Sequence, residues 1–127
     1  MKNLFQVLKT LGYEVYENIY QGENENLSEP FILWNIERDL PVFEAFDEPV
    51  ELERSFQIHL YTPISFDYNL IVKDIREKCC EYGYSYPVIC NSIVDNIETN
   101  GSANYQKFLV RHTILTTSKT YNIKEKN

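Results

Sequence analysis

Two histidines are the side chains best suited to acid–base chemistry near neutral pH. His59 and His112 both lie in stretches where apolar and polar residues alternate, which is typical of β-strands. Neither has a carboxylate or a thiol at a spacing that is diagnostic of catalysis. They are either general bases or strand histidines on a half-buried or exposed face, and the pattern favours the second interpretation.

Three cysteines, Cys79, Cys80 and Cys90, could coordinate zinc only if the fold brought them to a histidine in a tetrahedral arrangement. An odd number of cysteines, two of them adjacent, does not make a disulfide framework, so reduced thiols are expected. Thiols that pack as small core residues on a helix and a strand are the favoured interpretation. We therefore predict no metal site and no cofactor.

Acidic residues between positions 44 and 53 could bind calcium, but they lack the spacing and the glycine of a calcium loop. A solvated acidic loop is favoured. The sequence also contains no glycine-rich phosphate loop, no paired-cysteine zinc pattern, no H-E-x-x-H helix and no G-x-S-x-G elbow. We predict from this that the protein is not an enzyme.

The net charge of −7 is unevenly distributed. Residues 21–53 hold ten acids against Arg38, and residues 107–127 hold five cations against Glu125. The acidic part of one copy could therefore meet the basic part of another. Specific nucleic-acid binding is not expected, because a DNA-binding surface is normally basic.

Two aromatic residues, Phe43 and Phe46, lie inside this acidic region. They either fold back on the sheet as a lid or anchor a subunit interface, since aromatic residues within polar rims are typical of interface centres. The residues predicted to make such contacts are Phe43, Glu44, Phe46, Asp47 and Glu48, with Lys107, Arg111 and Lys119 as complements.

Amphipathic helices are predicted at residues 3–11 and 67–82. Asp67 is a suitable N-cap for the second helix, and Gly12 and Gly83 are placed to end the two helices. The apolar residues expected to face the core are Leu4, Val7, Leu8 and Leu11, then Leu70, Ile71, Ile75 and Cys79.

Strands are predicted at residues 13–19, 31–37 and 51–61, with an irregular edge or protruding loop at 39–49 because Pro41 and Pro49 cannot donate to a central ladder. Asn100 and Gly101 favour a two-residue type I′ turn. The predicted pairs across that turn are Ile97 with Asn104, Ile93 with Phe108, and Ile89 with His112.

These elements predict an α+β fold in which two helices pack on one face of a mainly antiparallel sheet of four to five strands, with a long C-terminal β-hairpin. The length of 127 residues indicates one domain, residues 1–118, followed by a polar tail, residues 119–127. No stretch approaches the ~20 apolar residues of a membrane span, and no signal peptide is recognisable, so a cytoplasmic location is expected.

Three stretches in this order carry a resemblance to a known family. An N-terminal helix runs into Leu-Gly-Tyr-Glu-Val-Tyr at residues 11–16, then come Pro-Phe-Ile-Leu-Trp at 30–34 and Phe-Gln-Ile-His-Leu-Tyr-Thr at 56–62. Over about residues 4–86 the chain resembles the small tail-terminator and head–tail joining proteins of long-tailed phages and related prophages.

The resemblance implies an α+β subunit that forms a ring with itself, usually a hexamer, at the head-proximal end of the tail tube. Such a ring stops tube growth and docks the tail to the head connector, with no catalytic residue required. The implied partners are the tail-tube and connector proteins, and the implied location is the host cytoplasm and then the virion neck. The alternative is a cytosolic acidic binding module or inhibitor of a basic partner, for example a DNA mimic.

Overall fold

The computed structural model describes residues 3–18, 29–45, 48–101 and 104–122, and within these ranges it leaves out the side chains of residues 43–50 and 96–108. The described chain is α+β, with two helices and a mixed five-stranded sheet. In chain order the elements are α1 (Leu4–Lys9), β1 (Glu14–Glu17), β2 (Phe31–Ala45), β3 (Glu48–Pro63), α2 (Tyr68–Glu81), β4 (Val88–Gly101) and β5 (Asn104–Asn122).

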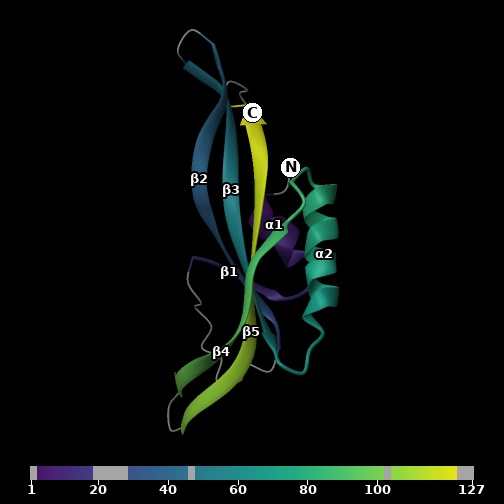
Figure 1. Cartoon of the computed structure of the whole chain (residues 1–127), viewed down its shortest axis with the longest axis vertical. Helices are drawn as coiled ribbons and strands as arrows, with labels where there is room; N and C mark the ends of the chain where they lie inside the picture. Colours follow the sequence, from purple (N-terminus) through teal and green to yellow (C-terminus); the bar gives the residue numbers. More distant parts are fainter. Residues whose placement is uncertain (1–2, 19–28, 46–47, 102–103, 123–127) are drawn as a thin grey trace.

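The sheet has the strand order β1-β2-β3-β5-β4 (Figure 1). The pairs β2–β3, β3–β5 and β4–β5 are antiparallel, whereas β1 runs parallel to β2. A parallel pair needs a crossover of about a dozen residues, and residues 18–30 provide that length. The sheet is therefore mixed, and β1 and β4 are its edge strands.

Both predicted helices form, and local chemistry sets their ends. Asn3 and Gln6 make a reciprocal capping box at α1, and the Asp67 side chain accepts a hydrogen bond of 3.0 Å from the Asn69 N–H at α2. Gly12 and Gly83 follow the helices with φ values of 89° and 87°. Glycine adopts this left-handed conformation without the steric cost that a Cβ imposes, so the chain turns away at Gly12, three residues after α1 ends, and at Gly83, two residues after α2 ends.

The two helices pack on one face of the sheet and build the core between the layers (Figure 1). Along β3, alternate residues face the helices, while Gln57, His59 and Tyr61 point to the other face. The sequence placed Leu70 in the core, but its side chain is 62% exposed and Val72 is buried instead. The central core residues are Leu4, Val7, Leu8, Ile32, Ile58, Leu60, Ile75 and Leu115.

Of the two predicted alternatives for residues 39–49, the described residues form the irregular edge and not the protruding loop. β2 continues to Ala45 and β3 begins at Glu48, with Asp39 opposite Arg54 and Pro41 opposite Leu52. The partnership of β1 with β2 ends at Trp34, so the rest of β2 is an edge strand that tolerates proline. The ladder also has register shifts between Ile36 and Glu44, which indicate bulges or irregular pairing. We call residues 36–42 of β2 the acidic arm; its net charge is −1, because Arg38 lies between the acids Glu37 and Asp39.

The predicted turn at Asn100 and Gly101 is wrong. Both residues belong to β4, where Gly101 pairs with Asn104, and Ile97 pairs with Phe108 in place of the predicted Asn104. Ile93 pairs with His112, also a shift of four residues, whereas Ile89 pairs with Leu115, a shift of three, because the ladder has a register shift between Ile89 and Asn91. Residues 102–103, which link β4 to β5, lie outside the described residues.

Residues 119–122 of the predicted polar tail, residues 119–127, belong to the sheet, because β5 continues to Asn122. Lys119 pairs with Arg54 and Tyr121 with Leu52, so β3 holds this segment in the sheet. Residues 123–127 lie outside the described residues. At one end of the molecule β2 and β3 extend past the helices, and at the other end β4 and β5 do so (Figure 1).

Candidate assembly surface

Six of the eight predicted contact residues lie, wholly or with their side chains, outside the described part of the chain. Phe46 and Asp47 lie outside the described residues. Phe43 and Glu44 belong to β2, Glu48 to β3 and Lys107 to β5, but their side chains are outside the described part. Their role in contacts between copies stays a prediction.

Arg111 and Lys119, predicted as complements, each contact one end of α2. The Arg111 guanidinium lies 4.8 Å from the ring centroid of Tyr68, the first residue of α2, and donates to Ser92 Oγ over 3.3 Å. Lys119 Nζ donates to the carbonyl of Tyr82, the C-cap of α2, over 3.0 Å. Eight strand residues span roughly 27 Å and the helix roughly 21 Å, so one strand can reach both helix ends. Both cations therefore hold α2 on the sheet.

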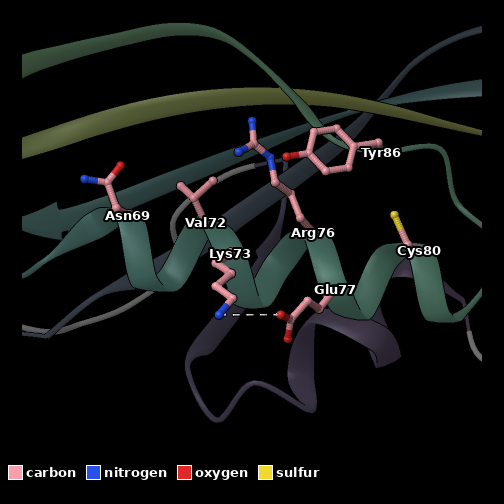
Figure 2. A pocket seen from close by; sticks show the side chains of 7 residues that line it. All are labelled: Asn69, Val72, Lys73, Arg76, Glu77, Cys80 and Tyr86. Carbon is pink, nitrogen blue, oxygen red and sulfur yellow. Dashed lines mark ion pairs between the residues drawn. The ribbon is translucent and has the colours of Figure 1, made fainter.

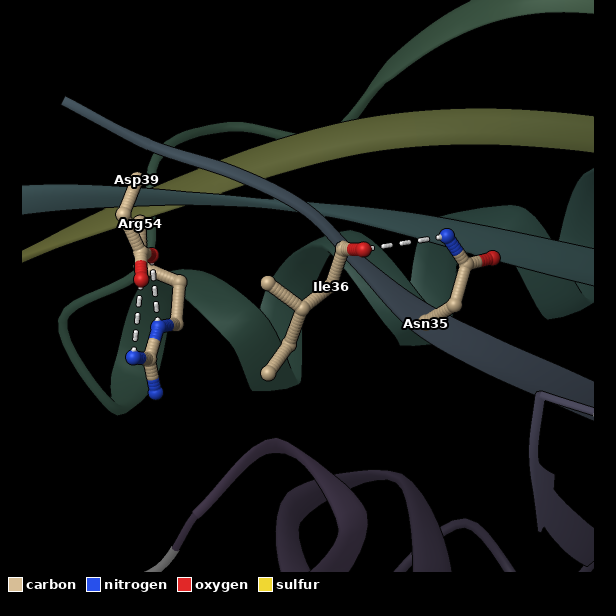
Figure 3. A network of polar contacts seen from close by, with 4 residues as sticks. All are labelled: Asn35, Ile36, Asp39 and Arg54. Atoms are coloured by element: carbon tan, nitrogen blue, oxygen red, sulfur yellow. Dashed lines mark hydrogen bonds and ion pairs between the residues drawn. The ribbon is translucent and has the colours of Figure 1, made fainter.

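The acidic arm is joined to β3 by an ion pair. Arg54 donates through Nε and Nη2 to the two carboxylate oxygens of Asp39, over 2.7 and 3.0 Å (Figure 3). These hydrogen bonds hold the pKa of Asp39 below its ordinary value. In the same view Asn35 Nδ2 donates to the carbonyl of Ile36 over 3.4 Å. The arm thus stays paired with β3 beyond the point where the pairing of β2 with β1 ends.

Glu37 of the arm is an exposed acid at the bulge between Ile36 and Arg38. Its carboxylate makes no ion pair with any residue of the described ranges. Two apolar side chains nearby, Leu40 and Val42, are 41% and 53% exposed. The arm therefore presents an acid together with apolar surface.

On the opposite edge of the sheet, a pocket of about 360 Å³ lies beside the start of β4 (Figure 2). The stripe of α2 that lines it has the spacing of one helix face, and Tyr86 provides a further wall. We call this pocket and the adjoining outer edge of β4 the α2–β4 groove. The residues lining the pocket are Asn69, Val72, Lys73, Arg76, Glu77, Cys80 and Tyr86.

Arg76 is the central cation of the α2–β4 groove. Its Nε donates to the carbonyl of Pro87 over 2.9 Å, and its guanidinium lies 4.6 Å from the centroid of the Tyr86 ring. No carboxylate in the described part of the chain forms an ion pair with Arg76, whereas Lys73 lies 3.9 Å from Glu77. The guanidinium is thus fixed by a carbonyl and a ring, and its charge is not neutralised locally.

The helix-free face of the sheet carries a ladder of stacked rings. Phe31 stacks on Tyr61 with centroids 4.7 Å apart, and Tyr61 stacks on His112 at 4.2 Å. His59 Nδ1 lies 2.8 Å from His112 Nε2, and His59 Nε2 lies 3.2 Å from Gln57 Oε1. Since an amide oxygen only accepts, His59 donates to Gln57 and accepts from His112.

Burial lowers the pKa of both histidines. For His59 the neighbouring His112 lowers the pKa further, and for His112 the charge of Asp95 acts in the opposite direction. Both side chains are half-buried strand histidines, the interpretation that the sequence favoured. Their direct contact was not predicted, because the two positions are 53 residues apart.

The cysteines do not gather into one site. Cys79 is buried in the core, which raises the pKa of its thiol to about 12, while Cys80 and Cys90 are exposed. Among the described residues no three His, Cys, Asp or Glu side chains are grouped so as to hold a metal ion. In the same residues neither helix is both long and apolar enough to cross a membrane.

A comparison of the sequence with models of known protein families finds no match, and neither does a comparison with curated proteins.

Sequence reasoning missed Arg76 and Tyr86 as surface residues of interest. Arg76 follows Val72 and Lys73 at helical spacing, which marks a shared helix face, but only the position of β4 turns that face into a groove wall. The signal available in the sequence was the spacing alone.

Proposed function

We propose that this chain is a structural subunit of a phage or prophage particle, a tail-terminator-like protein that assembles into a ring, usually a hexamer, at the head-proximal end of the tail. In this role it works by contact, without a catalytic residue. Its partners are other copies of itself, the tail-tube protein and the head connector. It resides in the host cytoplasm during assembly and then in the virion neck.

One observation carries the proposal: two different surfaces with free strand edges lie at opposite sides of one sheet. The acidic arm continues beyond β1 on one side, and β4 is the edge strand on the other. Ring assembly needs such a heterologous contact, in which one patch of a subunit meets a different patch of the next. Free strand edges are also surfaces that pair readily with other chains.

The long strands support the same role. In our proposal β4 and β5 form a C-terminal hairpin that projects past the helices, while β2 and β3 project at the other end (Figure 1). Two projections from opposite ends of a subunit would allow contacts above and below a ring, to the connector and to the tail tube.

Sedimentation velocity and light scattering test the proposal, with the full chain at low and high salt, alone and mixed with tail-tube or connector protein. The expected result is a closed ring, alone or on its target, visible by negative-stain electron microscopy. A strict monomer that binds neither protein would overturn the proposal. A salt-sensitive one-to-one complex with a basic host protein would favour the acidic binding module in its place.

A further inference from the structure

We infer that the α2–β4 groove is the receiving half of the contact between copies, and that its occupant is the acidic arm of a second copy. This inference rests on the proposed function, since it specifies which two surfaces meet in the ring. It differs from the sequence prediction, in which Lys107, Arg111 and Lys119 complement the acidic region.

Arg111 and Lys119 are poor candidates for a contact with a neighbour, because both already bind within the subunit. Arg111 contacts Tyr68 and Ser92, and Lys119 contacts the Tyr82 carbonyl. A neighbour that recruited them would have to displace these interactions, at the two ends of α2. Arg76 also binds within its subunit, to the Pro87 carbonyl and the Tyr86 ring, but unlike Arg111 and Lys119 it lines the pocket, away from the two ends of α2.

The position of Arg76 beside a strand edge defines the shape of the occupant. The pocket adjoins Tyr86 and Pro87, directly before β4 begins at Val88. An extended segment that lies along this edge can direct side chains towards α2, and the register shifts of the acidic arm interrupt the strict alternation that would put Glu37 opposite Leu40 and Val42. The groove therefore fits an extended segment with an acidic side chain for Arg76 and apolar side chains beside it (Figure 2).

The acidic arm has both features. Glu37 is exposed and makes no ion pair with a described residue, and Leu40 and Val42 follow it with exposed apolar side chains. The groove offers matching apolar surface, since Tyr86 is 58% exposed. Pro41 and the register shifts limit regular backbone pairing, so we expect side-chain contacts and the Glu37–Arg76 ion pair to dominate.

The geometry of this contact is head-to-tail. The arm is at the β2 side of the sheet and the groove at the β4 side, so each copy can give its arm to one neighbour and receive the arm of another. A contact between two different patches leads to a ring when the rotation closes. A two-fold pairing of β4 with β4 of a second copy would use neither the arm nor its charge.

A reciprocal charge exchange tests this inference by sedimentation velocity on the full chain. Arg76→Glu alone and Glu37→Lys alone should each weaken self-association at least about tenfold, because each places like charges at the contact. An equal mixture of the two variants should restore assembly, since both contacts in an alternating ring again join opposite charges. Lys78→Glu, on the same helix but outside the groove, is the matched control and should assemble like the wild type.

The outcomes separate the two proposals. If the wild type assembles and both variants assemble equally well, the groove inference is wrong and the proposed function stands. The inference also fails if the variants are monomers but their mixture stays monomeric, or if β4–β4 dimers form. If the wild type never assembles, alone or on tail-tube or connector protein, the proposed function itself fails. Because Glu37 is exposed at a bulge, its variant should fold even if Arg76→Glu does not.

Discussion

His59 accepts a hydrogen bond from His112 over 2.8 Å, across the pair of strands β3 and β5. A proton added to His59 Nδ1 would place two N–H groups against each other and break this bond. The neutral pair is therefore part of the packing of the helix-free face, where His112 also stacks on Tyr61.

We expect this pair to make the fold less stable in mild acid. Both folded-state pKa values lie below the ordinary value of 6.5, so below about pH 6.5 the unfolded chain binds protons that the folded chain does not. The contribution is present above that pH and is lost as the pH falls through the folded pKa values. Urea unfolding between pH 7.5 and 5.5 measures it, and the double variant His59→Gln/His112→Gln should flatten the slope. An unchanged slope would contradict the prediction.

The Lys119 ammonium group should stabilise the C-terminal end of α2. Lys119→Met keeps most of the aliphatic stem but removes the hydrogen bond to the Tyr82 carbonyl, and we expect the free energy of unfolding to fall by about 1–2 kcal/mol. Lys78→Met is the matched control, since Lys78 contacts Glu81 at the helix surface and should matter by less than about 0.5 kcal/mol. Equal losses in the two variants would argue against a capping role.

The buried face of α2 can be tested with two deletions on one helix. Ile75→Ala removes atoms from a fully buried position and should cost about 2–5 kcal/mol in chemical denaturation. Leu70→Ala should cost less than about 0.5 kcal/mol, because that side chain is largely exposed. A large loss of unfolding free energy in Leu70→Ala would mean that Leu70 is buried in the core, as the sequence predicted.

The ion pair of Asp39 with Arg54 should contribute less than about 1 kcal/mol, since both side chains are about one-third exposed and solvent screens them. Asp39→Asn should show this loss at neutral pH, and added salt should reduce it. Because the pKa of Asp39 is lowered, the contribution is present above its unfolded pKa of 3.8 and disappears as the pH falls through the folded value. Glu53→Gln is the control, because the Glu53 carboxylate forms no ion pair with a described residue.

The helices were the most predictable part of the fold. The capping chemistry of Asp67 and the left-handed conformation of Gly12 and Gly83 act within a few residues, so the sequence shows them directly. Leu70 was misplaced because it is next to the buried stripe, and periodicity cannot distinguish neighbouring positions at the border of a stripe. Only the packing of α2 on the sheet decides which of Leu70 and Val72 is covered.

Strand register was less predictable. The Asn-Gly pair favours a turn through local backbone preference, but the ladder between β4 and β5 sums many cross-strand contacts and places both residues in the strand. Likewise, Pro41 argued against a central strand at residues 39–49 and left a protruding loop and an irregular edge as alternatives, of which the described residues form the edge. The proline is accepted because β1 ends early and leaves that part of β2 at an edge.

The sequence by itself determined the α+β class, the two helices with their ends, and the concentration of acid in the middle of the chain. Tertiary structure alone decided that His59 meets His112, that β5 holds both ends of α2, and that Arg76 lies beside the edge of β4. The physical reason is the sequence separation of the interacting residues, since helix caps and periodicity depend on neighbours only a few residues away. Which strand edges and charges remain uncovered depends on the order of strands in the sheet and on where each strand ends.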